Sequence, residues 1–343
     1  MKLAIISDIH FGVNYGKPPF VEYQKRYFND FWKTIDEQGI DNVLFLGDFF
    51  HSRKMVNYDT LELAVKCWFE PAMERGTHIF MLVGNHDVFY KNTNRLNSLD
   101  LLCWNKNIKV ISSPKTIRID ERSYCFIPWI NVENQNECIS ELENTQASVV
   151  LSHLELQLDD NPHIKGQIDI DKLARFSHVF SGHFHSPCVK DITGCTLRYL
   201  GSPYEMNWND FGIEDRGFYI FDDVTKETTL IKNERTIHHY FKLGEDCSWI
   251  EPWHSVRCIV PNNMSNTDYE IATQALKSKN VMKVQMIAEE TKEDDTEKDE
   301  LEIGQELDIL QVVLKYADAN KGTLDGERLN TIIKGLWEDL KVE

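Results

Sequence analysis

Five short polar motifs, each directly after an apolar run, constrain this chain more than any other feature. They are Ser7-Asp8-Ile9-His10, Gly47-Asp48-Phe49-Phe50-His51, Gly84-Asn85-His86-Asp87, Ser152-His153 and Gly182-His183-Phe184-His185. Short unbroken apolar runs such as Leu3–Ile6 are typical of strands buried on both faces. Side chains that follow the carboxyl ends of such strands meet at one edge of a sheet, where ligands bind in α/β folds. We therefore expect the five motifs to converge on one site.

The motifs supply donor types that suit a pair of divalent metal ions. Asp and Asn oxygens with neutral imidazoles favour manganese, iron or zinc, whereas a thiolate-rich set would indicate structural zinc or iron–sulfur. A pair of such ions can clamp a phosphodiester, lower the pKa of a shared water and offset charge on the transition state. The residues thus predict a two-metal phosphoesterase.

Composition limits the alternatives. At 343 residues and 42% hydrophobic content, the chain can bury one large core and a smaller module. No apolar stretch reaches the roughly 20 residues that span a bilayer, and Met1 leads straight into the first motif, so we expect no membrane segment and no secretion. The eight cysteines are scattered without a Cys-x-x-Cys pair, which favours reduced thiols and a cytoplasmic address.

The net charge of −18 argues against an indiscriminate binder of polyanions. Much of the excess is local, because residues 289–300 hold eight acids against Lys292 and Lys298. This segment is predicted to be a solvated acidic linker.

Strand and helix patterns alternate up to about residue 240. Helical spacing covers 23–37, 59–74 and 97–104, and the aromatic residues on these faces are expected in the core: Trp32, Trp68, Phe69 and Trp104. The later part is rich in strand patterns, at 115–120, 123–127, 198–200, 217–221 and 227–231. The two patterns together predict an α/β fold with four layers, namely a β-sandwich flanked by helices.

The pattern changes after residue 240. A strand at 255–260, a helix at 267–277 capped by Thr267 and a strand at 281–288 predict a small β-α-β capping domain over 241–288. Beyond the linker, apolar residues recur at three- and four-residue steps over 301–319 and 328–340. Residues 301–343 are therefore predicted to be helical, either packed on the body or, as we favour, docked on a partner.

The motif order resembles that of the SbcD-type recombination nucleases, which belong to the calcineurin-like metallophosphoesterases. Further matching segments are Ile127-Pro128-Trp129, Tyr199-Leu200-Gly201-Ser202-Pro203 and Arg216-Gly217-Phe218-Tyr219. The resemblance covers about residues 1–240, with domain order alone beyond, and the short chain is most similar to phage members. It implies a Mn-dependent DNA nuclease, with Mg as a weaker alternative, that acts as double-strand exonuclease and single-strand endonuclease in DNA recombination, repair and replication.

The resemblance also implies partners. Residues 301–343 would bind an SbcC-like coiled-coil ATPase subunit, residues 241–288 would contact DNA, and helices around 59–74 and 97–104 would form a homodimer.

Residue roles follow from the same resemblance. The implied metal ligands are Asp8, His10 and His185 at the first metal, Asp48 between both metals, and Asn85, His153 and His183 at the second. His86 would lie near the scissile phosphate with Asp87 orienting its ring, and His51 would be a second phosphate-side histidine. Ser152 departs from the family pattern, so only His153 is carried over from that motif.

Other function classes stay open. A small-molecule phosphodiesterase or protein phosphatase of the wider superfamily is the main alternative, although phosphatases usually carry Asp-Arg-Gly soon after the second motif and this chain has His51-Ser52-Arg53. A non-catalytic scaffold is a third class, against which the intact ligand set counts. The remaining histidines singled out as structural are His163, His178, His238, His239 and His254.

Overall fold

The computed structural model describes residues 1–102, 105–158, 166–261 and 264–289. The described residues form three sheets, and they all belong to one compact unit, Met1–Glu290. The predicted helices of 301–343 and the linker beyond Glu289 lie outside the described residues. No helix in the described ranges is long and apolar enough to cross a membrane.

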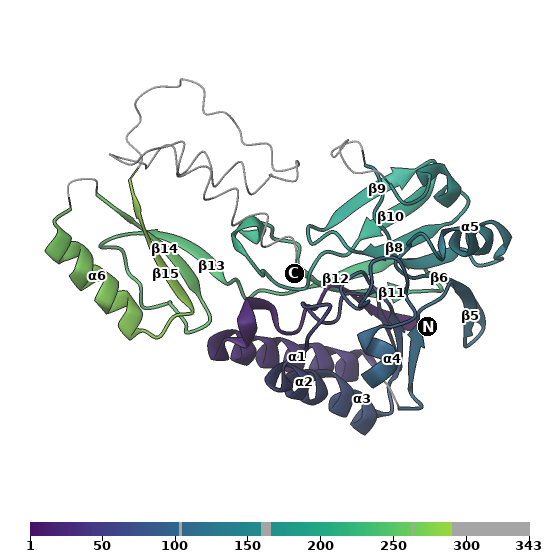
Figure 1. Ribbon diagram of the computed structural model, residues 1–343, viewed down its shortest axis with the longest axis horizontal. Helices are drawn as coiled ribbons and strands as arrows, with labels where there is room; N and C mark the ends of the chain where they lie inside the picture. The colour runs from purple at the N-terminus through teal and green to yellow at the C-terminus, as the bar shows by residue number, and fades with distance from the viewer. Residues whose placement is uncertain (103–104, 159–165, 262–263, 290–343) are drawn as a thin grey trace, which may run out of the picture. The chain divides into compact units, whose positions relative to one another are not determined.

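The first sheet carries the first three motifs. Its strand order is β12-β11-β1-β2-β3-β4, with β1 to β4 parallel to one another, β11 antiparallel to β1 and β12 antiparallel to β11. Figure 1 labels β11 and β12 of this sheet. Its strands are β1 (Lys2–Ile6), β2 (Asn42–Phe45), β3 (His78–Leu82), β4 (Ile108–Ile111), β11 (Gly217–Asp222) and β12 (Thr228–Lys232).

The second sheet carries the last two motifs, in the order β5-β6-β7-β8-β10-β9. Its strands are β5 (Lys115–Ile119), β6 (Arg122–Ile127), β7 (Val149–His153), β8 (His178–Gly182), β9 (Cys188–Ile192) and β10 (Cys195–Tyr199). Parallel pairing of β6, β7, β8 and β10 brings the ends of β7 and β8 to the same edge.

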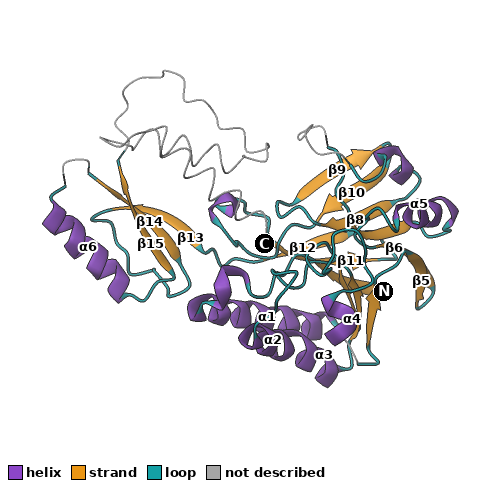
Figure 2. Cartoon of the chain, in the orientation of Figure 1, coloured by secondary structure: helices purple, strands orange, loops and turns teal. Residues whose placement is uncertain are grey.

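Strand side chains alternate between faces, and this builds the layers. Ala4 and Ile6 of β1 pack among the helices, whereas Leu3 and Ile5 pack against Phe126 and other residues of the second sheet. Both faces of each sheet are thus covered, which explains the unbroken apolar strands. The predicted four-layer α/β sandwich is confirmed (Figure 2).

Helices cover the outer faces of both sheets. On the first sheet they are α1 (Pro18–Gln38), α2 (Tyr58–Ala64), the π-helical η2 (Val65–Phe69), α3 (Glu70–Arg75) and α4 (Ser98–Leu102). On the second they are α5 (Gln135–Asn144) and the 3-10 turn η3 (Ile170–Leu173). The shorter turns are η1 (Val13–Gly16) and η4 (Trp208–Asp210).

The predicted single helix at 59–74 is wrong in detail, because it is interrupted by a π-helical turn. Pro71 has no N–H and cannot serve the carbonyl of Cys67 four residues earlier. That carbonyl instead accepts a hydrogen bond from Trp32 Nε1 at 2.7 Å. Trp32, Trp68 and Phe69 are buried as predicted, whereas Trp104 lies outside the described residues.

The third sheet is parallel, in the order β13-β14-β15, with α6 (Asn266–Ser278) between its last strands. The strands are β13 (His238–Lys242), β14 (Ser255–Val260) and β15 (Lys283–Ala288), so the predicted boundary at 240/241 falls inside β13. The predicted cap of the helix is also wrong: Ser265 Oγ accepts the N–H of Asp268, and Thr267 lies within the helix.

The base of this third sheet is tied to the body. Glu205 accepts the backbone N–H groups of Ile237 at 2.6 Å and His238 at 2.7 Å, while Arg26 lies over the Trp253 ring at 4.8 Å. The described cysteines are all free thiols, as predicted.

Candidate metal centre and active site

The five motifs lie in loops that follow β1, β2 and β3 and at the ends of β7 and β8. Asp8, His10, Asp48 and His183 have φ angles of 52°, 49°, 61° and 92°. Few non-glycine residues adopt this left-handed region, and they keep it only where the surrounding structure holds them. Such a concentration of backbone strain is typical of a functional site.

Glycines allow the motif loops to approach one another. A Cβ on Gly84 would lie 2.4 Å from Asp48 Oδ1, and one on Gly182 would lie 2.0 Å from Ser7 Oγ. Neither distance is compatible with a larger residue. The glycines before Asn85 and His183 therefore let motifs from different strands share one site.

One group of donors gathers around His10. Its Nε2 lies 3.1 Å from His185 Nε2, 3.6 Å from Asp48 Oδ2 and 3.9 Å from Asp8 Oδ1. These atoms come from four residues of three motifs, which follow strands of both sheets. They could hold one cation, with carboxylate and imidazole ligands on the same centre.

A second group gathers around Asn85. Its Oδ1 lies 2.9 Å from both His153 Nε2 and His183 Nδ1, and His153 Nε2 lies 3.4 Å from the other carboxylate oxygen of Asp48. Asp48 thus faces both groups with different oxygens. Ligand atoms of Asp8, Asp48 and His153 also lie within 4.8 Å of one another, so Asp8 stands close to the second group as well.

Burial sets the charge of the imidazoles. It lowers the pKa of His10, of His183 and of His185, the last to about 4, so these rings are neutral and able to bind a metal. Burial also lowers the pKa of His153, but Asp48, Asp8 and the Leu46 carbonyl together raise it to about 9, so a cation beside Asp48 would take the place of the proton on this ring. Burial, helped by Asp48, raises the pKa of Asp8 to about 7.

The donor set fits a pair of divalent cations. Close, dry carboxylates beside neutral imidazoles are costly by themselves, and cations between them offset that cost. When bound, such ions supply positive charge to a phosphate and lower the pKa of water.

Two candidate ligand rings have a polar partner at their other nitrogen, His153 through a hydrogen bond and His183 through a longer ionic contact. His153 Nδ1 lies 2.6 Å from the carbonyl oxygen of Leu46, and His183 Nε2 lies 3.7 Å from Glu155 Oε1. Such contacts fix the tautomer that leaves the facing nitrogen free for a metal. The neighbouring His183 ring lowers the pKa of Glu155. Glu155 was not predicted, since no local pattern links it to His183.

Trp129 covers the second group. Its ring centroid lies 5.2 Å from that of His183, and its backbone N–H donates to the carbonyl oxygen of Val83 at 2.9 Å. The Ile127-Pro128-Trp129 segment therefore contributes a wall to the site.

His51 and His86 stand beside the first group. His86 Nδ1 lies 2.7 Å from the carbonyl oxygen of His51, and the two rings stack at 5.9 Å. The His86 ring also lies 4.8 Å from that of His10. A proton on Nδ1, donated to this carbonyl, leaves Nε2 available to a ligand. The structure thus brings all the predicted site residues together.

The predicted role of Asp87 is wrong. Its carboxylate does not contact the His86 ring but accepts three backbone N–H groups, from Gly84, Asp48 and Phe49, each at 2.9 Å. The side chain is buried, and the donors come from two different motifs. Asp87 therefore fixes the second and third motif loops to each other.

Arg216 joins a further loop to the site. Its Nη1 donates to the carbonyl oxygen of His185 at 2.9 Å and contacts Ser202 Oγ, while Nη2 donates to Asp210 Oδ1 at 2.8 Å. The guanidinium is buried. The Arg216-Gly217-Phe218-Tyr219 segment thereby supports the backbone of a candidate metal ligand.

Comparison with known proteins agrees with this geometry. The family model of the calcineurin-like phosphoesterases matches residues 1–187. Exonuclease subunit 1 of Enterobacteria phage T4 is 30% identical over 262 residues, which cover 71% of this chain and 72% of the phage protein. This match confirms the resemblance to phage nuclease subunits.

Two solved structures are more distant. An archaeal phosphodiesterase is 13% identical, with 68% of this chain and 100% of that chain covered and a TM-score of 0.38. A dimetal phosphatase from Danio rerio is 12% identical, with 64% and 91% covered and a TM-score of 0.43. At these scores neither bears on the reaction. Sequence and site agree that the chain belongs to the calcineurin-like phosphoesterase family and is a metal-dependent hydrolase of phosphate esters.

Proposed function

We propose that this enzyme is a Mn-dependent DNA nuclease, with double-strand exonuclease and single-strand endonuclease activity. The observation that carries the proposal is the sharing of Asp48 between two donor groups, with His86 held beside them by the His51 carbonyl. This arrangement suits in-line hydrolysis of a phosphodiester. The choice of DNA as substrate rests on the similarity to the phage exonuclease subunit.

The proposed roles follow the positions of the side chains. Asp8, His10, Asp48 and His185 hold the first ion, and Asp48, Asn85, His153 and His183 hold the second. Manganese suits this mixed set of oxygen and nitrogen donors, with Mg as a weaker alternative. His86 protonates or hydrogen-bonds the leaving oxygen, and His51 supports the phosphate side.

The proposed complex has an SbcC-like coiled-coil ATPase as partner. Its docking element would be residues 301–343, and residues 241–288 would contact DNA. Such a complex would act in recombination, repair and replication in the cytoplasm, that of the host cell if the gene is carried by a phage. The support is the similarity to a protein named as a subunit.

A homodimer through the helices at 59–74 and 97–104 is also proposed, with a smaller surface than the sequence indicated. Trp68 and Phe69 are buried within the chain and unavailable to a second copy. Apolar residues near these helices that are exposed include Met55 at 70%, Tyr58 at 90%, Met73 at 56% and Leu96 at 42%.

The test is hydrolysis of labelled single- and double-stranded DNA with Mn²⁺, compared with a small phosphodiester and a phosphoserine peptide. We expect cleavage of DNA that Asp48→Asn abolishes. His178→Gln, a half-buried histidine at the start of β8, is the matched control and should keep activity. Hydrolysis of the small ester or the peptide without cleavage of DNA would support the phosphodiesterase or phosphatase alternative instead.

A further inference from the structure

Three aromatic rings and an arginine meet between the loop of η4 and the third sheet. We call Trp208, Phe211, Tyr240 and Arg257 the aromatic platform. The ring centroids of Phe211 and Tyr240 are 4.9 Å apart, and those of Trp208 and Tyr240 are 5.1 Å apart. Arg257 Cζ lies 3.9 Å from the centroid of the Trp208 ring. Residues from three separate elements thus form one surface.

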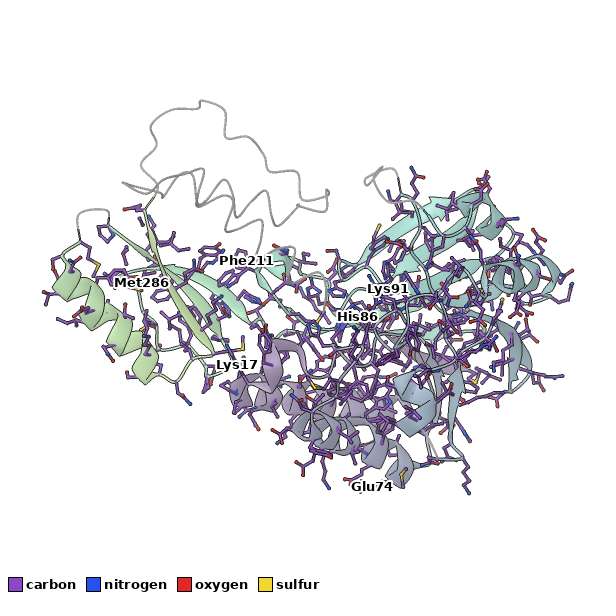
Figure 3. The ribbon with its side chains drawn as sticks, in the orientation of Figure 1. Lys17, Glu74, His86, Lys91, Phe211 and Met286 are labelled. Carbon is purple, nitrogen blue, oxygen red and sulfur yellow. The ribbon has the colours of Figure 1, made fainter. Side chains whose placement is uncertain are left out.

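The platform is open to a ligand. Phe211 is 45% exposed and Tyr240 is 41% exposed, although aromatic rings of this size favour burial (Figure 3 labels Phe211). Arg257 donates to Tyr240 and to Gln285 Oε1, and within the described ranges it has no carboxylate partner. The surface therefore combines the exposed parts of the Phe211 and Tyr240 rings with an arginine that has no acidic partner among the described residues.

The platform is rigidly joined to the metal centre. Asn207 and Asp210 form a reciprocal capping box around η4, and Asp210 Oδ2 also accepts the N–H of Met206 at 2.7 Å. The other oxygen of Asp210 binds Arg216, which donates to the carbonyl of His185. Phe211 directly follows Asp210 in the chain and is therefore attached to this network. A ligand on the platform is thereby held in a fixed relation to the site.

From these contacts we infer that the platform stacks the unpaired bases of a nucleic-acid strand whose backbone enters the metal centre. This deepens the proposed nuclease function and rests on it. Bases offer flat faces to Phe211 and Tyr240 whatever their sequence, and Arg257 attracts the strand's phosphates. In a duplex the base faces are already stacked on one another, so the platform favours single strands and frayed ends.

The test is binding of a short oligothymidylate and of a blunt duplex of the same length, measured with Ca²⁺ in place of Mn²⁺ to slow cleavage. In Phe211→Ala/Tyr240→Ala, we expect the Kd for the single strand to rise about 10-fold or more, with a much smaller change for the duplex. Arg257→Gln should weaken single-strand binding and reduce its salt dependence. Tyr269→Ala is the control, since Tyr269 is 43% exposed on α6 but outside the platform.

A folded double variant, with the melting temperature of the control, that binds the single strand as tightly as the unmodified protein would overturn the inference. A double variant with a lowered melting temperature is replaced by Phe211→Leu/Tyr240→Leu, which keeps apolar volume but removes the ring faces. Absence of DNA cleavage by the unmodified protein with Mn²⁺ would refute the proposed function. The comparison of Kd values would still decide the platform.

Discussion

Replacement of Asp87 by Ala gives the sharpest test of how the site is held. The change removes one buried carboxylate and leaves the N–H groups of Gly84, Asp48 and Phe49 without their acceptor. Each buried donor left unsatisfied costs about 1–3 kcal/mol. Water that enters the vacated space recovers part of this, so we expect a loss of about 5 kcal/mol in the free energy of unfolding. The free energy of unfolding of a whole domain is about 5–15 kcal/mol, so this loss is severe.

The assay is urea unfolding together with metal content after dialysis. Asp87→Ala should unfold at lower urea and lose metal, because the loops that present Asp48 and Asn85 are no longer joined. Asp87→Asn keeps one acceptor oxygen and should lie between the unmodified protein and the alanine variant. His86→Ala is the control, since it comes from the same loop and its ring is only half-buried.

The opposite result would restore the interpretation from sequence. If Asp87→Ala matched His86→Ala in stability and metal content and only turnover fell, Asp87 would act through the His86 ring.

Four further predictions concern the site, the third sheet and the tail. Asp48→Ala should lose at least one metal per chain and several orders of magnitude in rate, measured by metal analysis and turnover; a variant with both metals and normal activity would end the assignment. His86→Ala should keep its metals and lose about 10²–10⁴-fold in turnover, and loss of metal in step with activity would make His86 a ligand. Burial lowers the pKa of His254 from 6.5 to about 4, and its Nδ1 accepts the N–H of Glu251, so its stabilisation is complete above pH 6.5 and is lost as the pH falls toward 4. The free energy of unfolding should therefore fall more steeply in the unmodified protein than in His254→Gln as the pH drops from 6.5 toward 4, and parallel pH profiles would contradict this. Deletion of residues 296–343 should leave Mn-dependent cleavage intact and abolish co-purification with the ATPase, which pull-down checks; retained binding would place the interface elsewhere.

The sequence by itself determined which residues meet. Asp8, Asp48 and His183 each follow an apolar run, and the period and length of those runs are local properties of the chain. Buried parallel strands end at a common edge, so the convergence of the motifs followed from strand assignment alone. The donor chemistry likewise required only residue types, which is why a metal-dependent phosphoesterase was predicted correctly.

Only the tertiary structure decided how those residues are held. Asp87 accepts backbone N–H groups of Asp48 and Phe49, nearly forty positions away, and Glu155 lies 3.7 Å from His183, which follows another strand. In the π-helical turn before Pro71, the Cys67 carbonyl has no partner within its own helix. It accepts a hydrogen bond from the indole N–H of Trp32 on another helix. Backbone groups carry no sequence signal, and a contact between distant segments leaves no periodic pattern.

The aromatic platform shows the same division. Trp208, Phe211, Tyr240 and Arg257 stand in no motif, and their separation along the chain gives no reason to group them. Their meeting depends on the packing of the η4 loop against β13 and β14, which Arg216 and Glu205 stabilise. Local chemistry in the sequence thus determined the reactive centre. Long-range hydrogen bonds and packing determined how that centre is supported and which surface lies beside it, because such contacts depend on distances that only the folded chain sets.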